Sequence, residues 1–300
     1  MANYLLANAA KLEVNQMHMG IVQHIVQRSG VYALLPWKQI AGAAYQYTRR
    51  TTLPTASWVA EDGSLSSASS ANTQVTATPT TLYAQSEVSG LAQAMGRSSN
   101  SVANEIQAMA ESLGNEFKSK LIAGSGSSNQ ISGIKTLATA ASRDNLDTAA
   151  TDGSAITFSR LRALRDSMNL GISAYICSYR THRSIEALLD AAGGATYGDI
   201  GNGYKRPVLM FDGIPVLPDD AVVTNETQGA TTTCARVHAV YFDEVNGLTG
   251  LYAGEYPLGF NFENLGKMEG KDNTILRLLW YVQLINHSIY AVGSIKGVTN

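Results

Sequence analysis

The segment between residues 45 and 84 most restricts what this chain can fold into. Residues 45–60 are rich in aromatic and β-branched side chains, and residues 73–84 return to a strand-like alternation. Between them, Glu61-Asp62-Gly63 is a turn signal, and ten of the 18 residues from Ser64 to Thr81 are Ser or Thr. The pattern predicts two long antiparallel strands joined by a polar tip. Such a hairpin has too few apolar residues to bury its own surface, so it must lie on something else, typically another subunit.

The charge of the chain is low and unevenly distributed. Charged residues are 15% of the 300 residues, compared with about 25% in an average globular protein. The net charge of −2 disfavours a uniformly basic nucleic-acid-binding protein, and 45% hydrophobic residues make a disordered chain unexpected. Residues 1–55 carry +4 and the remainder −6. A basic arm that lies on an acidic neighbour or faces nucleic acid explains this better than chance does.

The sequence shows no targeting or membrane signal. Apolar residues near the start are interrupted by Asn3, Asn8, Lys11 and Glu13, which is not the pattern of a signal peptide. No apolar stretch reaches the roughly 18 residues of a membrane-spanning helix. The two cysteines are too few for a disulfide scaffold or a zinc site. We therefore expect a protein that is made in a cytosol, contacts no membrane and keeps its cysteines reduced.

An apolar repeat every three or four residues predicts one long helix from Val102 to Leu121. Gly124 stands where a left-handed C-terminal cap is expected. Helices and strands then alternate, and Asp212-Gly213 between two apolar runs predicts a tight hairpin. The tail from residue 275 to 295 has mainly strand character. The pattern predicts an α+β fold in which the end of the chain completes an earlier sheet.

No catalytic motif stands out. A nucleophile elbow, a zinc-binding helix and a phosphate loop are all missing from the sequence. Three adjacent acidic pairs occur, and they are Glu61-Asp62, Asp219-Asp220 and Asp243-Glu244. All of them lie beside turn residues, where we expect solvated carboxylates. His238 is expected to be a structural histidine in a strand. The sequence therefore predicts no catalytic residue, no cofactor and no metal.

Arg49-Arg50, with Tyr45, Tyr47 and Trp58 nearby, is the only cluster of basic and aromatic residues. Such a cluster binds single-stranded nucleic acid by stacking in other proteins. Two arginines make a weak electrostatic footprint, however, and a contact with a carboxylate of another subunit explains them at least as well.

The order of elements resembles that of the major capsid proteins of tailed bacteriophages, which have the Hong-Kong-97 capsid fold. An arm, a long hairpin, a long helix, an α/β module and a late return of the chain follow in the same sequence. Local motifs also resemble this family, and they are Trp58-Val59-Ala60-Glu61, Leu121 to Gly126 with Ile131 to Ile134, and Phe211 to Val216.

The resemblance implies a division of the chain into four parts. Residues 1–44 would be an N-terminal arm and residues 45–84 an extended loop, here called the E-loop. Residues 85–129 and 251–300 would form a peripheral (P) domain, and residues 130–250 an axial (A) domain. The implied contacts with other subunits come from the E-loop and the arm, through Arg49, Arg50, Trp58, Glu61, Asp62, Lys11, Arg28 and Lys38.

The resemblance also implies a function. The chain would assemble as hexamers and pentamers into the icosahedral shell of a virion, in the host cytoplasm, around double-stranded DNA. Partners would be a portal and a scaffolding or decoration protein. Some family members crosslink covalently through an E-loop lysine, but residues 51–85 contain none, so this chemistry is not expected here. The alternatives are the shell of an encapsulin-like nanocompartment and, less favoured, a hydrolase with a hidden site.

Overall fold

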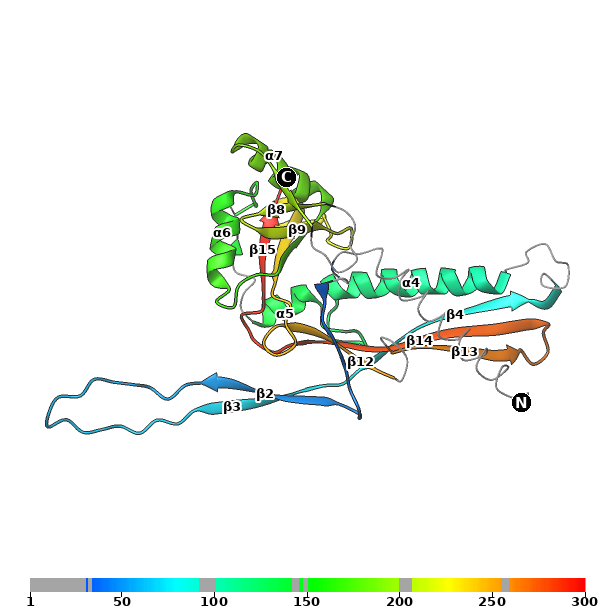
Figure 1. Ribbon diagram of the computed structural model, residues 1–300, viewed down its shortest axis with the longest axis horizontal. Coiled ribbons are helices and arrows are strands. Elements are labelled where there is room, and N and C mark those ends of the chain that lie inside the picture. The colour runs from blue at the N-terminus through cyan, green and yellow to red at the C-terminus, as the bar shows by residue number, and fades with distance from the viewer. Residues whose placement is uncertain are drawn as a thin grey trace, which may run out of the picture.

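The computed structural model describes residues 31, 34–91, 101–141, 146–147, 151–199, 207–254 and 259–299. The first 30 residues of the predicted N-terminal arm therefore lie outside the described residues. The chain forms two β-sheets, a long helix and a hairpin that projects far from the body (Figure 1). This is the α+β architecture that the sequence predicts.

Strand β14 (Asn273–Asn286) is the centre of the first sheet. One of its edges pairs antiparallel with β4 (Thr80–Ser89). The other edge of β14 pairs antiparallel with two strands. β13 (Phe260–Lys267) pairs with residues 274–280, and β12 (Leu248–Ala253) pairs with residues 281–286. A short strand, β1 (Trp37–Gln39), extends the sheet parallel to β12. The tail of the chain thus completes a sheet to which β1 and β4 contribute earlier, as the sequence predicts.

The long helix α4 (Ser101–Ala123) packs on this sheet. Its apolar stripe is buried at Ile106, Met109, Leu113, Phe117 and Leu121, at the spacing that the sequence predicts. The Phe117 ring centre lies 4.5 Å from that of Trp280 in β14, which in turn lies 4.5 Å from that of Phe260. Alternate residues of β14 are buried, so one face of the strand carries this contact.

Gly124 ends α4 in a different way from the prediction. It does not have a positive φ, and Gly126, with φ of 71°, is the left-handed residue of this turn. A Cβ at position 124 would instead collide with the backbone carbonyls of Ile131 and Lys120. The glycine is needed because the returning chain passes very close to the helix end.

The second sheet has eight strands in the order β5-β15-β11-β6-β9-β8-β7, and β10 pairs with β11. Helices α6 (Phe158–Ser167) and α7 (Tyr179–Ala191) lie beside it, and α5 (Ile134–Ala140) follows α4. The strands are β5 (Leu146–Asp147), β6 (Ala174–Cys177), β7 (Thr196–Gly198), β8 (Val208–Phe211), β9 (Ile214–Pro218), β10 (Glu226–Gln228), β11 (Thr231–Val240) and β15 (Val292–Val298).

This sheet is buried on both faces. In β6, Ala174 and Ile176 face the core that includes α4, whereas Tyr175 and Cys177 face a second core that includes residues of α6 and α7. The predicted Asp212-Gly213 turn joins β8 to β9, and both residues have positive φ, at 48° and 80°. One core is therefore shared by the two sheets.

The end of the chain divides between the two sheets. β14 belongs to the first sheet, but β15 pairs with β11 and β5 in the second. The division expected from sequence placed all of residues 251–300 with the long helix, because the strand character of the tail hides the short turn between β14 and β15.

The hairpin consists of β2 (Tyr45–Thr52) and β3 (Ala71–Ala77), paired antiparallel as predicted. Residues 53–70 form its unpaired tip, which reaches far beyond the body (Figure 1). β3 is followed almost at once by β4, so the hairpin is a direct extension of the first sheet.

The aromatic contact between α4 and β14 generates the first prediction. Replacement of Phe117 by Ala should lower the free energy of unfolding by about 3–5 kcal/mol, since the ring is fully buried. Replacement of the exposed Tyr83 in β4 by Ala should change it by about 0.5 kcal/mol or less. Urea unfolding followed by circular dichroism measures both. Equal effects of the two substitutions would contradict the proposed packing.

Candidate functional site

The base of the hairpin is fastened to the end of β14 by side chains of β2. The Tyr47 hydroxyl donates a hydrogen bond to the Asn286 carbonyl at 3.0 Å. The Arg49 guanidinium donates to the His287 carbonyl at 3.1 Å and also to the Asn286 carbonyl. Because Tyr47 and Arg49 alternate with exposed residues along β2, one face of the strand makes all of these contacts.

Aromatic rings complete this junction. The Tyr47 ring centre lies 5.0 Å from that of His287, and the Tyr45 ring meets the same imidazole edge-on at 6.1 Å. The Lys38 ammonium lies 3.1 Å from the Tyr45 hydroxyl and 4.7 Å from the centre of its ring. A cation–π contact therefore joins the segment before the hairpin to β2.

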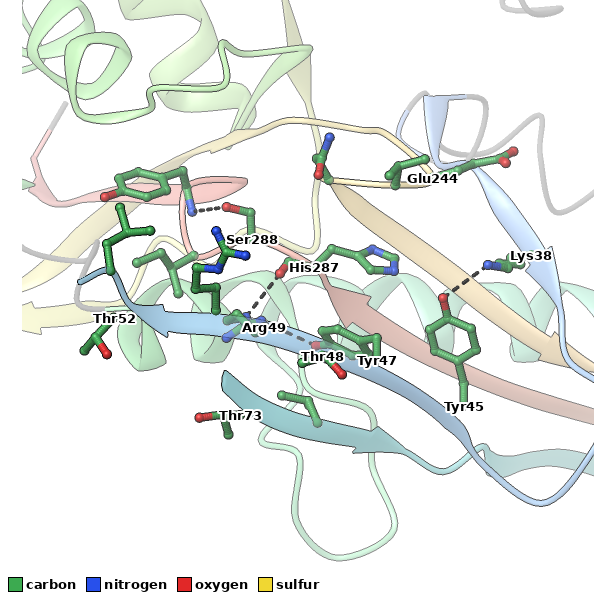
Figure 2. A pocket seen from close by; sticks show the side chains of 17 residues that line it. Lys38, Tyr45, Tyr47, Thr48, Arg49, Thr52, Thr73, Glu244, His287 and Ser288 are labelled. Atoms are coloured by element: carbon green, nitrogen blue, oxygen red, sulfur yellow. Dashed lines mark hydrogen bonds between the residues drawn. The ribbon is translucent and has the colours of Figure 1, made fainter. Parts of the chain in front are cut away.

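These residues line a groove of about 980 Å³ between the hairpin and two turns of the body. Figure 2 shows the side chains of Lys38, Tyr45, Tyr47, Arg49 and His287 gathered along it. The further lining residues are Thr48, Arg50, Thr52, Leu53, Thr73, Val75, Glu244, Val245, Asn246, Ser288, Ile289 and Tyr290. We call this surface the hairpin groove.

The hairpin groove is positively charged. Lys38, Arg49 and Arg50 line it, and no carboxylate of the described residues forms a salt bridge with any of them. Glu244 is the only acidic lining residue. Burial lowers the pKa of His287, the contact with the Gly247 carbonyl opposes this shift, and the nearby charges of Lys38 and Arg49 reinforce it.

The tip of the hairpin has the opposite character. The Trp58 side chain is fully exposed, at 103%, and Leu53 and Leu65 are also exposed. Glu61 and Asp62 stand in an exposed turn, which is closed by a hydrogen bond of 2.9 Å from the Gly63 amide to the Ala60 carbonyl. Nothing in the described part of the chain covers this apolar and acidic surface.

The structure thus divides the predicted contact residues into two groups. Lys38, Arg49 and Arg50 share the hairpin groove, whereas Trp58, Glu61 and Asp62 belong to the unpaired tip. Lys11 and Arg28 lie outside the described residues. Arg49 is engaged with carbonyls of its own chain, and Arg50 is exposed. The sequence carried no signal for His287, Ile289 or Tyr290, because they follow Arg49 by more than 230 residues.

A buried ion pair connects α4 with the loop after β9. The Lys118 ammonium lies 3.4 Å from an Asp219 carboxylate oxygen and also contacts Asp220. The side chains of Lys118 and Asp219 are only 13% and 3% exposed. The expectation of solvated carboxylates is therefore wrong for Asp219. Burial opposes the charge of Lys118, but the hydrogen bond to Asp220 and the two negative charges outweigh it and raise the pKa of the ammonium group.

The described residues contain no group of three or more His, Cys, Asp or Glu side chains that could hold a metal ion. No helix among them is long and apolar enough to cross a membrane. Cys177 and Cys234 are free and buried, and burial raises the pKa of the Cys177 thiol.

The profile of the phage capsid family matches residues 12–248. The chain belongs to the phage capsid family. A search of curated protein sequences found no match.

Solved structures share its fold. The SrpI encapsulin of Synechococcus elongatus PCC 7942 is 12% identical, with a TM-score of 0.69 over 90% of this chain and 87% of that one. The capsid of cyanophage A-1(L) is 14% identical, with a TM-score of 0.64 over 90% and 92%. A structure from Mycobacterium phage Adephagia is 14% identical, with a TM-score of 0.61 over 90% of each chain. The fold is the Hong-Kong-97 capsid fold that the sequence predicts.

The buried ion pair of this capsid-family protein generates a second prediction. Lys118→Met should lower the free energy of unfolding by about 3 kcal/mol, because it leaves Asp219 buried without its cation. The raised pKa of Lys118 means that the wild-type pair contributes fully below pH 10.5 and is lost as the pH rises through the raised value. Urea unfolding between pH 7 and 11.5 should therefore show a larger alkaline loss of stability in the wild type than in the variant, in which buried groups such as Tyr175 and Cys177, whose pKa values burial raises, still contribute a loss. A variant as stable as the wild type would contradict this role.

A third prediction concerns the hairpin base. Arg49→Met should remove the hydrogen bonds to Asn286 and His287 and lower the opening free energy of the hairpin by about 1.5 kcal/mol. Amide hydrogen exchange of β2 and β3 in the unassembled subunit should then be about tenfold faster. Arg50→Met, on the exposed neighbouring residue, is the matched control and should leave exchange unchanged. Faster exchange in both variants, or in neither, would contradict the assignment.

Proposed function

We propose that this protein is the major capsid protein of a tailed phage, which assembles with copies of itself into an icosahedral shell around double-stranded DNA. The observation that carries the proposal is the projecting hairpin, whose tip exposes Trp58 and has nothing to pack on among the described residues. Membership of the phage capsid family supports it. The shell would be the virion capsid, assembled in the host cytoplasm, and the protein would act without enzymatic activity.

The mechanism is assembly through repeated modest contacts. Each chain offers a projecting hairpin and a body, so that the hairpin of one copy lies on the body of the next. Such a head-to-tail contact closes into a ring when the rotation between copies is right, and rings of five and six then tile a shell. Specific protein interfaces commonly bury about 1,200–2,000 Å² in total.

The parts of the chain take corresponding roles. We propose that residues 1–44 form an arm along a neighbour and that residues 45–84 form the E-loop. Residues 85–129 with most of 251–300 would form the P domain, and residues 130–250 the A domain around the five- and six-fold axes. β15 (Val292–Val298) would be the exception within residues 251–300, because it pairs in the second sheet and would belong to the A domain.

Other partners follow from the proposed shell. A portal would occupy one vertex, and a scaffolding or decoration protein would assist assembly or bind outside. Contact with packaged DNA would be non-specific and made through the phosphate backbone. Because residues 51–85 contain no lysine, the E-loop cannot supply the amine for covalent crosslinking between subunits.

A second candidate is the shell of a cellular nanocompartment. The TM-score of 0.69 with the SrpI encapsulin favours it, because this value exceeds those of the two phage structures compared above. The content of purified particles distinguishes the candidates. Double-stranded DNA of uniform length would support the phage capsid, and a packed protein would support the compartment.

Removal of the hairpin tip tests the proposal and is the fourth prediction. Residues 53–70 would be replaced by Asn-Gly, which joins paired strands in a two-residue turn at the Thr52 and Ala71 positions. The variant should unfold with nearly the same free energy as the wild type, since no residue of 53–70 belongs to a core cluster of the described residues, yet form no particles. Light scattering after size exclusion and electron microscopy measure assembly.

The wild-type chain is the control and should form particles of megadalton mass. A wild-type protein that stays a compact monomer under all assembly conditions would contradict the proposed function. Normal particles from the shortened variant would show that the tip is not an assembly element.

A further inference from the structure

The hairpin tip and the hairpin groove carry opposite charges. Between residues 51 and 86 the only charged residues are Glu61 and Asp62, both acidic and both exposed at the tip. The groove has three cations and one carboxylate, Glu244, among its lining residues. Each subunit therefore presents an acidic end and a basic recess at two ends of the same hairpin.

The basic recess is distinct from the rest of the described surface. Most other lysines and arginines there are neutralised by a carboxylate within 4.0 Å. They are Lys118, Lys120, Lys135, Arg162, Arg165, Arg236, Lys267 and Arg277. In the hairpin groove, by contrast, Lys38 bonds to a tyrosine, Arg49 bonds to backbone carbonyls and a tyrosine, and Arg50 is exposed. Their positive charges are left for a ligand.

The groove also offers apolar and aromatic surface that matches the tip. Val245 is 71% exposed and Ile289 is partly exposed, next to the rings of Tyr45 and Tyr47. The tip presents Trp58 only three residues before Glu61. An indole that stacks on a tyrosine or a guanidinium, followed by carboxylates that accept from arginine, is a complementary set of contacts.

The tip cannot reach this groove within its own chain. The strands of the hairpin pair continuously from Tyr45 with Ala77 to Thr52 with Ala71, except for one irregularity beside Thr52. The tip extends beyond them, away from the body (Figure 1). The tip that can enter this groove is therefore that of another copy.

We propose that the hairpin groove receives the Trp58–Gly63 turn of a neighbouring copy, with Glu61 and Asp62 facing Arg50 and Lys38. The inference rests on the proposed function, since it requires copies to assemble. The E-loop of one copy would then end on the hairpin groove of the next. The contact is head-to-tail, so every subunit in a closed ring gives one tip and receives another.

Other occupants fit less well. Residues 1–30 carry Lys11 and Arg28 against Glu13, so they have the same sign of charge as the groove. Nucleic acid has the correct charge, but three cations give a small electrostatic footprint, and the exposed Val245 and Ile289 do not suit a phosphate backbone.

A charge exchange tests the inference. Arg50→Glu alone and Glu61→Arg alone should each lower the yield of particles at least about tenfold, the effect of a small loss of free energy at every contact. The two substitutions combined should restore the yield to within about threefold of the wild type, because this pair forms again with exchanged signs while Asp62 and Lys38 stay unchanged. Lys271→Glu, an equal charge change at an exposed position in the turn between β13 and β14, is the matched control and should leave the yield unchanged.

The outcomes separate the inference from the proposed function. A wild-type chain that forms no particles contradicts both. Wild-type particles with charge variants that assemble normally, or that are not rescued in combination, overturn only the inference. Normal shells of Arg50→Glu that retain less DNA would also overturn it and assign the groove to nucleic acid.

A crosslink provides a second test that does not depend on yield. Ala60→Cys and Val245→Cys would be combined in one chain, and assembled particles would be oxidised. Denaturing electrophoresis without reductant should then show a ladder of linked chains up to the size of a ring, which neither single variant produces. Cys177 and Cys234 are buried and do not contribute. Unlinked chains from intact oxidised particles would overturn the inference.

Discussion

The pairing of β14 along both of its edges is the interaction on which the rest of the molecule depends. Residues 273–282 pair with β4, while the opposite edge is shared in succession by β13 and β12. β4 begins three residues after β3 ends, so the hairpin is continuous with the most extensively paired part of the sheet. A hairpin that cannot bury itself is thereby held in a defined direction by a strand that is buried on one face. The tip is therefore connected through β3 and β4 to the core strand β14.

Side-chain chemistry distinguishes the inside of the subunit from the surfaces offered to other copies. Within the body, cations meet carboxylates, and the Lys118–Asp219 pair ties α4 to the second sheet where both groups are nearly excluded from water. At the hairpin base, cations meet only tyrosines and carbonyls. Such contacts fix the position of a guanidinium without neutralising it. The same side chain, Arg49, can therefore hold the hairpin in place and leave the groove positive.

The fold was largely predictable because its elements have strong local patterns. The helical spacing from Val102 to Leu121, the Asp212-Gly213 turn and the alternation of the hairpin strands each depend on neighbours in sequence. The groove could not be predicted, since Tyr47 and Asn286 are 239 positions apart and nothing local indicates their contact. Gly124 was assigned the wrong role for a similar reason. A side chain is excluded at position 124 because the backbone of Ile131 returns close to it, and no local sequence pattern indicates that approach.

The low charge of the chain and the Ser- and Thr-rich composition of the hairpin both keep each contact between copies weak. A closed shell forms without trapped errors only if each contact is weak enough to break, and exposed ion pairs contribute at most about 1 kcal/mol each. A tip rich in Ser and Thr adds adaptable hydrogen bonds but little apolar burial, so one contact alone would not hold two copies together. Trp58 provides the apolar part at a single position. Repetition around a ring then supplies the stability that no single hairpin could give, and the few charges need only select which surfaces meet.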